Sequence, residues 1–225
     1  MLGNIFILGD SYSTFAGHIP EGFASYYFES GPHYLVAHPN EAKPSERDVH
    51  TVEETWWYPL AQENGKLILN CSWSGTTICN TGYEGRDNSD VSFIARLEKL
   101  IDEGFFNENK IDTLFLFGGT NDSWSNAPLG EAKSCEWTKD DLYCVLPAFN
   151  YIIDLLIKKL PTVKVYCILN TWLKSEINEH YSTVCEERGI DIIKLHDIDK
   201  VCGHPTILGM KQIKDQILDF IRSKR

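Results

Sequence analysis

The stretch Asn4-Ile5-Phe6-Ile7-Leu8-Gly9-Asp10-Ser11 decides the fold. Its apolar run is short, and no basic region precedes it, which is typical of a first core strand buried inside a parallel sheet. Gly9 permits a tight turn after that run, so Ser11 is presented at the carboxyl end of the strand. The first strand is therefore expected at Asn4–Leu8.

Further apolar segments along the chain are equally short and are bounded by turn or polar residues. They are Lys66–Asn70, Thr113–Phe117, Val163–Leu169 and Asp191–Lys194. Segments with helical apolar spacing lie between them, for example Phe93, Ile94, Leu97, Leu100 and Ile101. This alternation predicts one α/β domain over residues 1–225, built on a mostly parallel five-stranded sheet.

Two irregular stretches interrupt the alternation, at about residues 12–50 and 123–137. Segments of this length without periodicity are usually functional in compact domains. Both leave the carboxyl ends of predicted strands, where open α/β sheets hold their ligand crevice. Between them, Thr51-Val52-Glu53-Glu54 has the pattern of a capping box and predicts a helix that runs through Thr55–Leu60.

The composition excludes several classes of protein. With 21 Lys and Arg against 32 Asp and Glu, the net charge of −11 disfavours nucleic-acid binding, which needs clustered positive charge. No apolar run approaches the ~20 residues of a membrane helix, and the N-terminus lacks the basic region of a signal peptide. If Met1 is the natural start, we expect a cytoplasmic protein. The seven cysteines show no CxxC spacing, so neither a disulfide framework nor a zinc site is expected.

Four short motifs at predicted strand ends carry residues that could take part in catalysis. Ser11 is a possible nucleophile, although a capping serine in a turn explains Gly-Asp-Ser equally simply. Gly75 could point its backbone N–H at an oxyanion, and the side-chain amide of Asn121 could donate to the same atom. His204, on a loop before the last predicted helix, could be a general base, whereas most lone histidines are structural.

Taken together and in this order, the motifs resemble the SGNH, or GDSL-type, serine hydrolase family. The resemblance is carried by Gly9-Asp10-Ser11, Gly75, Gly119-Thr120-Asn121-Asp122 and His204-Pro205, and it spans nearly the whole chain. It implies a three-layer α/β/α, flavodoxin-like fold and an esterase or acylhydrolase activity. It also implies Ser11 as nucleophile, His204 as base, and an oxyanion hole made by Ser11, Gly75 and Asn121. No cofactor or metal is implied.

One position departs from the family pattern. The family usually has an aspartate three residues before the histidine, and this chain has Val201 there. A serine–histidine pair needs an acceptor that holds the imidazole in the correct tautomer. Asp199 is the preferred candidate for that acceptor, Asp197 is another, and a main-chain carbonyl is a third possibility.

The expected substrate is a small ester, an acyl group on a sugar, a lipid or a small alcohol. Asp10, Tyr12 and Trp124 are the predicted substrate-binding residues, and Tyr12 and Trp124 belong to irregular stretches beside the site that are rich in aromatic residues. Core packing is an equally good explanation for most of those aromatics. Two alternatives stay open: a non-catalytic ligand-binding module whose triad has decayed, and a flavodoxin-like nucleotide or flavin binder.

Overall fold

The computed structural model of the protein describes residues 1–30 and 48–224. Its centre is a five-stranded, wholly parallel sheet in the order β2-β1-β3-β4-β5. The strands are β1 (Gly3–Gly9), β2 (Gly65–Ser72), β3 (Thr113–Phe117), β4 (Lys164–Leu169) and β5 (Asp191–Lys194). The five predicted strands are thus confirmed, and the strand order is the flavodoxin-like one.

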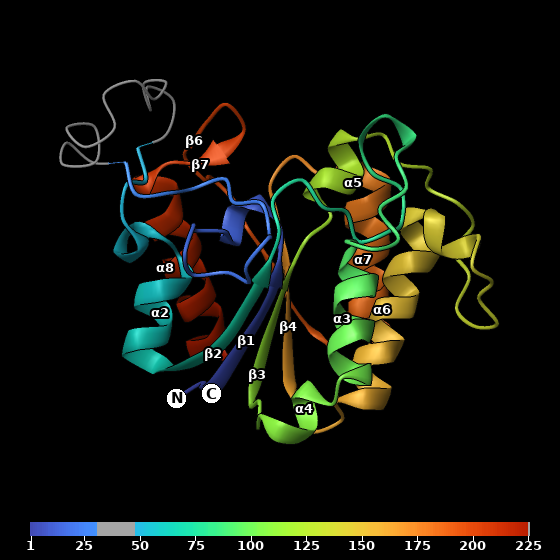
Figure 1. Ribbon diagram of the computed structural model, residues 1–225, viewed down its shortest axis with the longest axis horizontal. Coiled ribbons are helices and arrows are strands. Elements are labelled where there is room, and N and C mark those ends of the chain that lie inside the picture. The colour runs from blue at the N-terminus through green and yellow to red at the C-terminus, as the bar shows by residue number, and fades with distance from the viewer. Residues whose placement is uncertain (31–47, 225) are drawn as a thin grey trace.

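Helices cover both faces of the sheet and complete a three-layer α/β/α arrangement (Figure 1). One face carries α2 (Trp57–Asn64) and α8 (Ile207–Ser223). The other face carries α3 (Phe93–Asp102), α6 (Val145–Lys159) and α7 (Ser175–Arg188). The predicted fold class is confirmed. None of the helices in the described ranges is long and apolar enough to cross a membrane.

Side-chain alternation along the central strands fills both interlayer spaces. In β1, Phe6 and Leu8 pack toward the α3 and α6 side, whereas Ile5 and Ile7 pack toward the α2 and α8 side. All four side chains are essentially inaccessible to water. Burial of each such side chain contributes about 1.5–3 kcal/mol, so the sheet is a rigid platform for whatever leaves its carboxyl edge.

The capping box opens a shorter element than predicted. Glu54 accepts a hydrogen bond from the Thr51 backbone N–H at 3.0 Å, as the motif requires. The residues after Thr51 form only the 3-10 turn η2 (Val52–Glu54), and α2 begins separately at Trp57. The reason is local, because Thr55 has an extended backbone with ψ 157° and interrupts the helix.

A small hairpin stands above the carboxyl edge of the sheet, and the sequence reasoning missed it. It joins β6 (Lys200–Val201) to β7 (His204–Pro205) through the two residues Cys202 and Gly203. Both turn residues have positive φ, at 49° and 81°. Such a two-residue turn matches the twist of antiparallel strands and fixes their register, pairing Val201 with His204.

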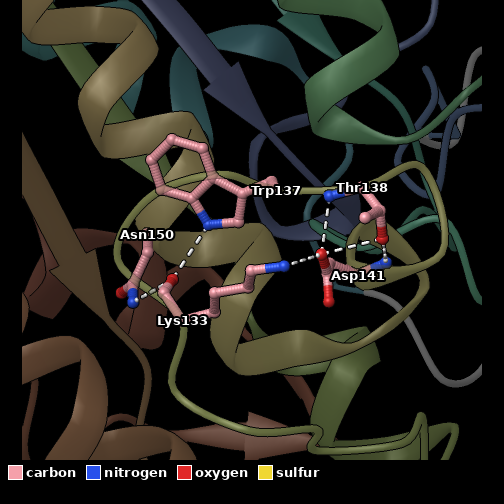
Figure 2. Close-up of polar contacts among 5 residues, drawn as sticks. All are labelled: Lys133, Trp137, Thr138, Asp141 and Asn150. Carbon is pink, nitrogen blue, oxygen red and sulfur yellow. Dashed lines mark hydrogen bonds and ion pairs between the residues drawn. The ribbon is translucent and has the colours of Figure 1, made fainter.

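The second irregular stretch folds against its neighbours instead of projecting freely. The short helix α5 (Thr120–Trp124) leads into it, and its end is tied to α6 and to η4 (Asp141–Tyr143). Figure 2 shows the ties: the Lys133 carbonyl accepts from Trp137 Nε1 and Asn150 Nδ2, both at 2.9 Å. The Lys133 ammonium pairs with Asp141 at 2.7 Å. Of the first irregular stretch, residues 31–47 lie outside the described residues.

Candidate active site

Ser11 lies directly after β1 in a one-turn helix whose start is capped. The turn is η1 (Ser11–Ser13), and the Asp10 carboxylate accepts a hydrogen bond from the Tyr12 backbone N–H at 3.1 Å. A side-chain oxygen that satisfies a free N–H at a helix start is a standard cap. The Ser11 side chain is 3% exposed, so its hydroxyl stands at the floor of the site.

Asp10 and Tyr12, two of the predicted substrate-binding residues, are wholly buried in the structure, and their contact with substrate stays a prediction. Neither side chain has any exposed surface. Burial is the largest cause that raises the pKa of Asp10 to about 7, and the nearby Asp122 adds to it. Arg96 lowers that pKa, and its guanidinium also donates to the Gly9 carbonyl at 3.3 Å. These groups therefore brace the carboxyl end of β1.

His204 and Ser11 are brought together from opposite ends of the chain. His204 Nε2 lies 2.9 Å from Ser11 Oγ, a hydrogen-bond distance. The other ring nitrogen, Nδ1, lies 3.3 Å from the carbonyl oxygen of Cys202 in the hairpin turn. Since a carbonyl can only accept, this contact favours the tautomer in which Nδ1 carries the proton and Nε2 faces the serine as an acceptor.

Aromatic rings surround the imidazole. The Tyr26 ring stacks on His204 with centroids 3.5 Å apart and planes 7° apart. Trp124 meets the imidazole edge-on at 5.8 Å, and Tyr12 lies at 5.4 Å. At least these aromatic residues of the irregular stretches therefore position the histidine. Trp124 is half-buried, and its contact with substrate stays a prediction.

Asp199, the predicted orienting acid, is engaged elsewhere. Its carboxylate accepts a hydrogen bond from the Thr206 hydroxyl, and its backbone N–H donates to Gln212 at 2.7 Å. Thr206 in turn caps the start of α8 by accepting from the Gly209 N–H at 3.1 Å. The structure therefore ties Asp199 to the helix start, and the contact at His204 Nδ1 comes from a backbone carbonyl.

Asn121 is hydrogen-bonded to the loop after β2. Asn121 Nδ2 donates to the Thr76 carbonyl at 2.9 Å, and Asn121 Oδ1 accepts from the Tyr83 hydroxyl at 2.8 Å. These two bonds fix which side of the amide faces the loop. The amide nitrogen carries a second hydrogen that neither bond uses. Gly75, one residue before Thr76, has φ +79° and is exposed, with open space where a side chain would stand.

Two buried charged residues hold these loops, and the sequence reasoning assigned neither of them this role. Asp122 accepts from the backbone N–H groups of Ile78 at 2.9 Å and Cys79 at 3.1 Å, and burial raises its pKa. Arg96 donates to the Cys71 carbonyl and to Thr76 Oγ1, the latter at 3.0 Å. Burial lowers the pKa of Arg96 to about 10. A lone arginine in a helical segment gave no sequence signal of this bracing.

The arrangement of Ser11, His204, Gly75 and Asn121 at one sheet edge suits acyl transfer. A serine hydroxyl beside an imidazole is an activated nucleophile. Amide and backbone N–H groups near it can stabilise an oxyanion. Within residues 1–30 and 48–224, no group of three or more His, Cys, Asp or Glu side chains could hold a metal ion.

Comparisons with known proteins identify relatives over nearly the whole chain. The family model described as GDSL-like lipase/acylhydrolase matches residues 3–221. A GDSL-like lipase structure from Bacteroides ovatus is 44% identical over 99% of both chains, with a TM-score of 0.87. One from Bacteroides uniformis is 41% identical over 98% of this chain and 96% of its own, with a TM-score of 0.85.

A more distant structure shares the fold alone. It is a family two carbohydrate esterase from Clostridium thermocellum, solved with cellohexaose. It is 14% identical over 99% of this chain and 64% of its own, with a TM-score of 0.61. A search of curated proteins gives no match.

Proposed function

Because the chain belongs to the GDSL-like lipase/acylhydrolase family, we propose that it hydrolyses a carboxylic ester through an acyl-enzyme on Ser11. The observation that carries the proposal is the 2.9 Å contact between Ser11 Oγ and His204 Nε2. A nucleophile and its base within hydrogen-bond reach are the central requirement of this chemistry.

In the proposed reaction His204 takes the Ser11 proton as Oγ attacks the ester carbonyl carbon. The imidazolium then gives that proton to the departing alcohol. Water, activated by the same imidazole, releases the acid and regenerates the serine. The Cys202 carbonyl, 3.3 Å from Nδ1, is proposed as the orienting acceptor in place of Asp199. An acceptor at Nδ1 keeps Nε2 free to accept a proton.

The proposed oxyanion hole comprises the backbone N–H groups of Ser11 and Gly75 and the Asn121 side-chain amide. Its support is the bonding of Asn121 to the Thr76 carbonyl at 2.9 Å, which places the amide beside the Gly75 loop. Donors held in place before the reaction stabilise developing charge without reorganisation, and loss of one costs about 3–4 kcal/mol of barrier.

The proposed substrate class is an acyl group on a sugar, a lipid or a small alcohol, with no nucleic-acid or membrane-spanning partner. The net charge of −11 disfavours strongly anionic esters. The fold relative with a bound cello-oligosaccharide makes acylated sugars the first substrates to try. A panel of acetylated sugars and p-nitrophenyl esters of increasing chain length would separate these classes.

A fluorophosphonate probe tests the nucleophile directly. We expect the wild type to be labelled and to hydrolyse p-nitrophenyl acetate. Ser11→Ala should lose labelling and lower kcat by about 10³-fold or more. Ser74→Ala, a serine on the neighbouring loop, is the matched control and should be labelled like the wild type. Labelling that persists in Ser11→Ala would refute the proposal.

The second candidate is a non-catalytic binding module on the same fold. Its support is Val201, which stands where the family has its aspartate. A wild-type protein that is neither labelled nor active on any ester of the panel would favour it.

A further inference from the structure

The position of His204 depends on a hairpin that is too short to be stable alone. β6 and β7 have only two residues each, and isolated two-stranded ribbons are marginal in water. The Nδ1 acceptor of His204 also belongs to this hairpin, because it is the Cys202 carbonyl. Contacts from outside the hairpin must therefore fix the imidazole relative to Ser11.

Lys200 supplies such a contact from the first residue of β6. Its ammonium donates to Asn170 Oδ1 at 2.9 Å and to Thr171 Oγ1 at 2.5 Å. Both acceptors directly follow β4, at the carboxyl edge of the sheet. The Asn170 amide is itself fixed, because its Nδ2 donates to Thr120 Oγ1 at 3.0 Å. Lys200 thus links the hairpin to the rigid sheet.

Two aromatic rings enclose this ammonium. Lys200 Nζ lies 5.3 Å from the centroid of the buried Tyr12 ring and 4.5 Å from that of Trp172. Trp172 is 70% exposed and has a φ of +65°, an unusual conformation for a tryptophan. A cation over an aromatic face is attracted by the ring, so both rings favour the charged form of Lys200.

A second contact holds the same hairpin from the Ser11 side. The Tyr12 hydroxyl donates to the Gly203 carbonyl in the turn. Tyr12 is the residue after Ser11, so the nucleophile and the turn share one anchor. The same Tyr12 contacts Lys200, because the ammonium lies over its ring.

We infer that Lys200 is a positioning residue, which holds the His204 hairpin at its hydrogen-bonding distance from Ser11 by bridging to Asn170 and Thr171. The inference rests on the proposed function for its kinetic consequence and on geometry alone for its structural one. The Cys202 carbonyl is the proposed acceptor at the imidazole, and the Lys200 bridge holds the hairpin that carries both that carbonyl and His204.

The charge on Lys200 gives the inference a pH signature. Burial lowers the Lys200 pKa to about 8, while the Asp10 charge opposes that change. Among the described residues, Tyr12 also faces the ammonium, and burial raises the pKa of its hydroxyl. As pH rises through about 8, the neutral amine keeps N–H groups but loses the charge that strengthens both hydrogen bonds and the attraction to the rings.

The experiment compares Lys200→Met, Lys200→Arg and Lys174→Met in the full chain. Lys174 is the matched control, because its ammonium also bonds an asparagine, Asn126 at 2.7 Å, but does not contact the hairpin. Kinetics on p-nitrophenyl acetate give kcat and KM across pH. Amide hydrogen exchange of residues 198–206 gives hairpin opening without any need for catalysis.

For Lys200→Met we expect kcat to fall about 10-fold or more with little change in KM, since small misplacements of catalytic groups are costly. Exchange over residues 198–206 should speed up about 10-fold. Lys174→Met should match the wild type in both. The wild-type kcat should decline above pH 8, and Lys200→Arg, which stays charged, should restore exchange protection and shift that decline upward.

Wild-type exchange in Lys200→Met would overturn the inference, whatever its kcat. Faster exchange with an unchanged kcat would overturn the claim that the hairpin position matters. If the wild type hydrolyses no ester, the proposed function fails, while the exchange comparison still decides whether Lys200 holds the hairpin.

Discussion

The two partners of the Ser11–His204 pair are held in opposite ways. Ser11 is supported by buried residues. Asp10 caps its turn, and Arg96 donates a hydrogen bond to the Gly9 carbonyl. His204 begins β7, directly after the two-residue turn of Cys202 and Gly203, and Cys202 is exposed. Buried residues that hydrogen-bond to one another tolerate little change without loss of stability. An exposed hairpin, in contrast, can move while the rest of the protein stays folded.

This difference divides the expected effects of mutation. Changes beneath Ser11 should alter the free energy of unfolding. Changes around His204 should alter catalysis while the fold persists. Asn121, in the short helix α5, lies between these cases, because it is buried but its proposed role is catalytic.

The largest effect in this comparison is expected for Asn121→Ala. Its amide is proposed to donate to the oxyanion, so kcat on p-nitrophenyl acetate should fall about 10²–10³-fold with KM nearly unchanged. The Tyr83 hydroxyl also loses its acceptor, and Tyr83→Phe is the control for that loss. A kcat within a few-fold of the wild type in Asn121→Ala would remove this residue from the proposed oxyanion hole.

A moderate, pH-dependent effect is expected for Asp10→Asn. The pKa of Asp10 is raised to about 7, so between about pH 4 and 7 the folded protein keeps a proton that the unfolded chain releases. Rising pH therefore lowers the free energy of unfolding of the wild type. The Asp10→Asn variant lacks this pH dependence, because asparagine does not ionise. As pH rises from 4 to 8, the free energy of unfolding of Asp10→Asn should increase relative to that of the wild type by about 2–4 kcal/mol. Urea unfolding across that range measures it, and a pH-independent difference would contradict it.

The smallest effect is expected for Asp199→Ala. Its carboxylate bonds the Thr206 hydroxyl at the start of α8, so stability should fall by about 1 kcal/mol. Esterase activity should stay within about 3-fold of the wild type, because the Cys202 carbonyl is the proposed acceptor for His204. A loss near 10⁴-fold would instead restore Asp199 as the orienting acid. Circular-dichroism melts and kcat on one preparation separate these results.

The sheet and the positions of the chemical residues could be read from the sequence. Buried parallel strands are short apolar runs with sharp ends, so Thr113–Phe117 and Asp191–Lys194 were predicted to the residue. Motifs that follow such runs meet at one edge, which explains why Ser11 and Asn121 could be placed at one site in advance.

The supporting residues could not be predicted, because long-range contacts define them. Asp10 is predicted to bind substrate, yet it is wholly buried, and the charged groups that shift its pKa, Arg96 and Asp122, lie far along the chain. The hairpin was missed because two-residue strands leave no periodicity, although Cys202-Gly203 is a turn signal. The role of Lys200 could not be predicted from the sequence, because its two acceptors lie about thirty residues away along the chain.

The register of the hairpin has a consequence for protein engineering. Val201 pairs directly with His204, and paired residues of two antiparallel strands share one face. Val201 is also 43% exposed, so water would remain available to a charge at that position. The backbone is therefore already laid out for an acidic side chain opposite the imidazole. A single codon change at residue 201 would introduce a carboxylate on the face of the hairpin that Val201 shares with His204.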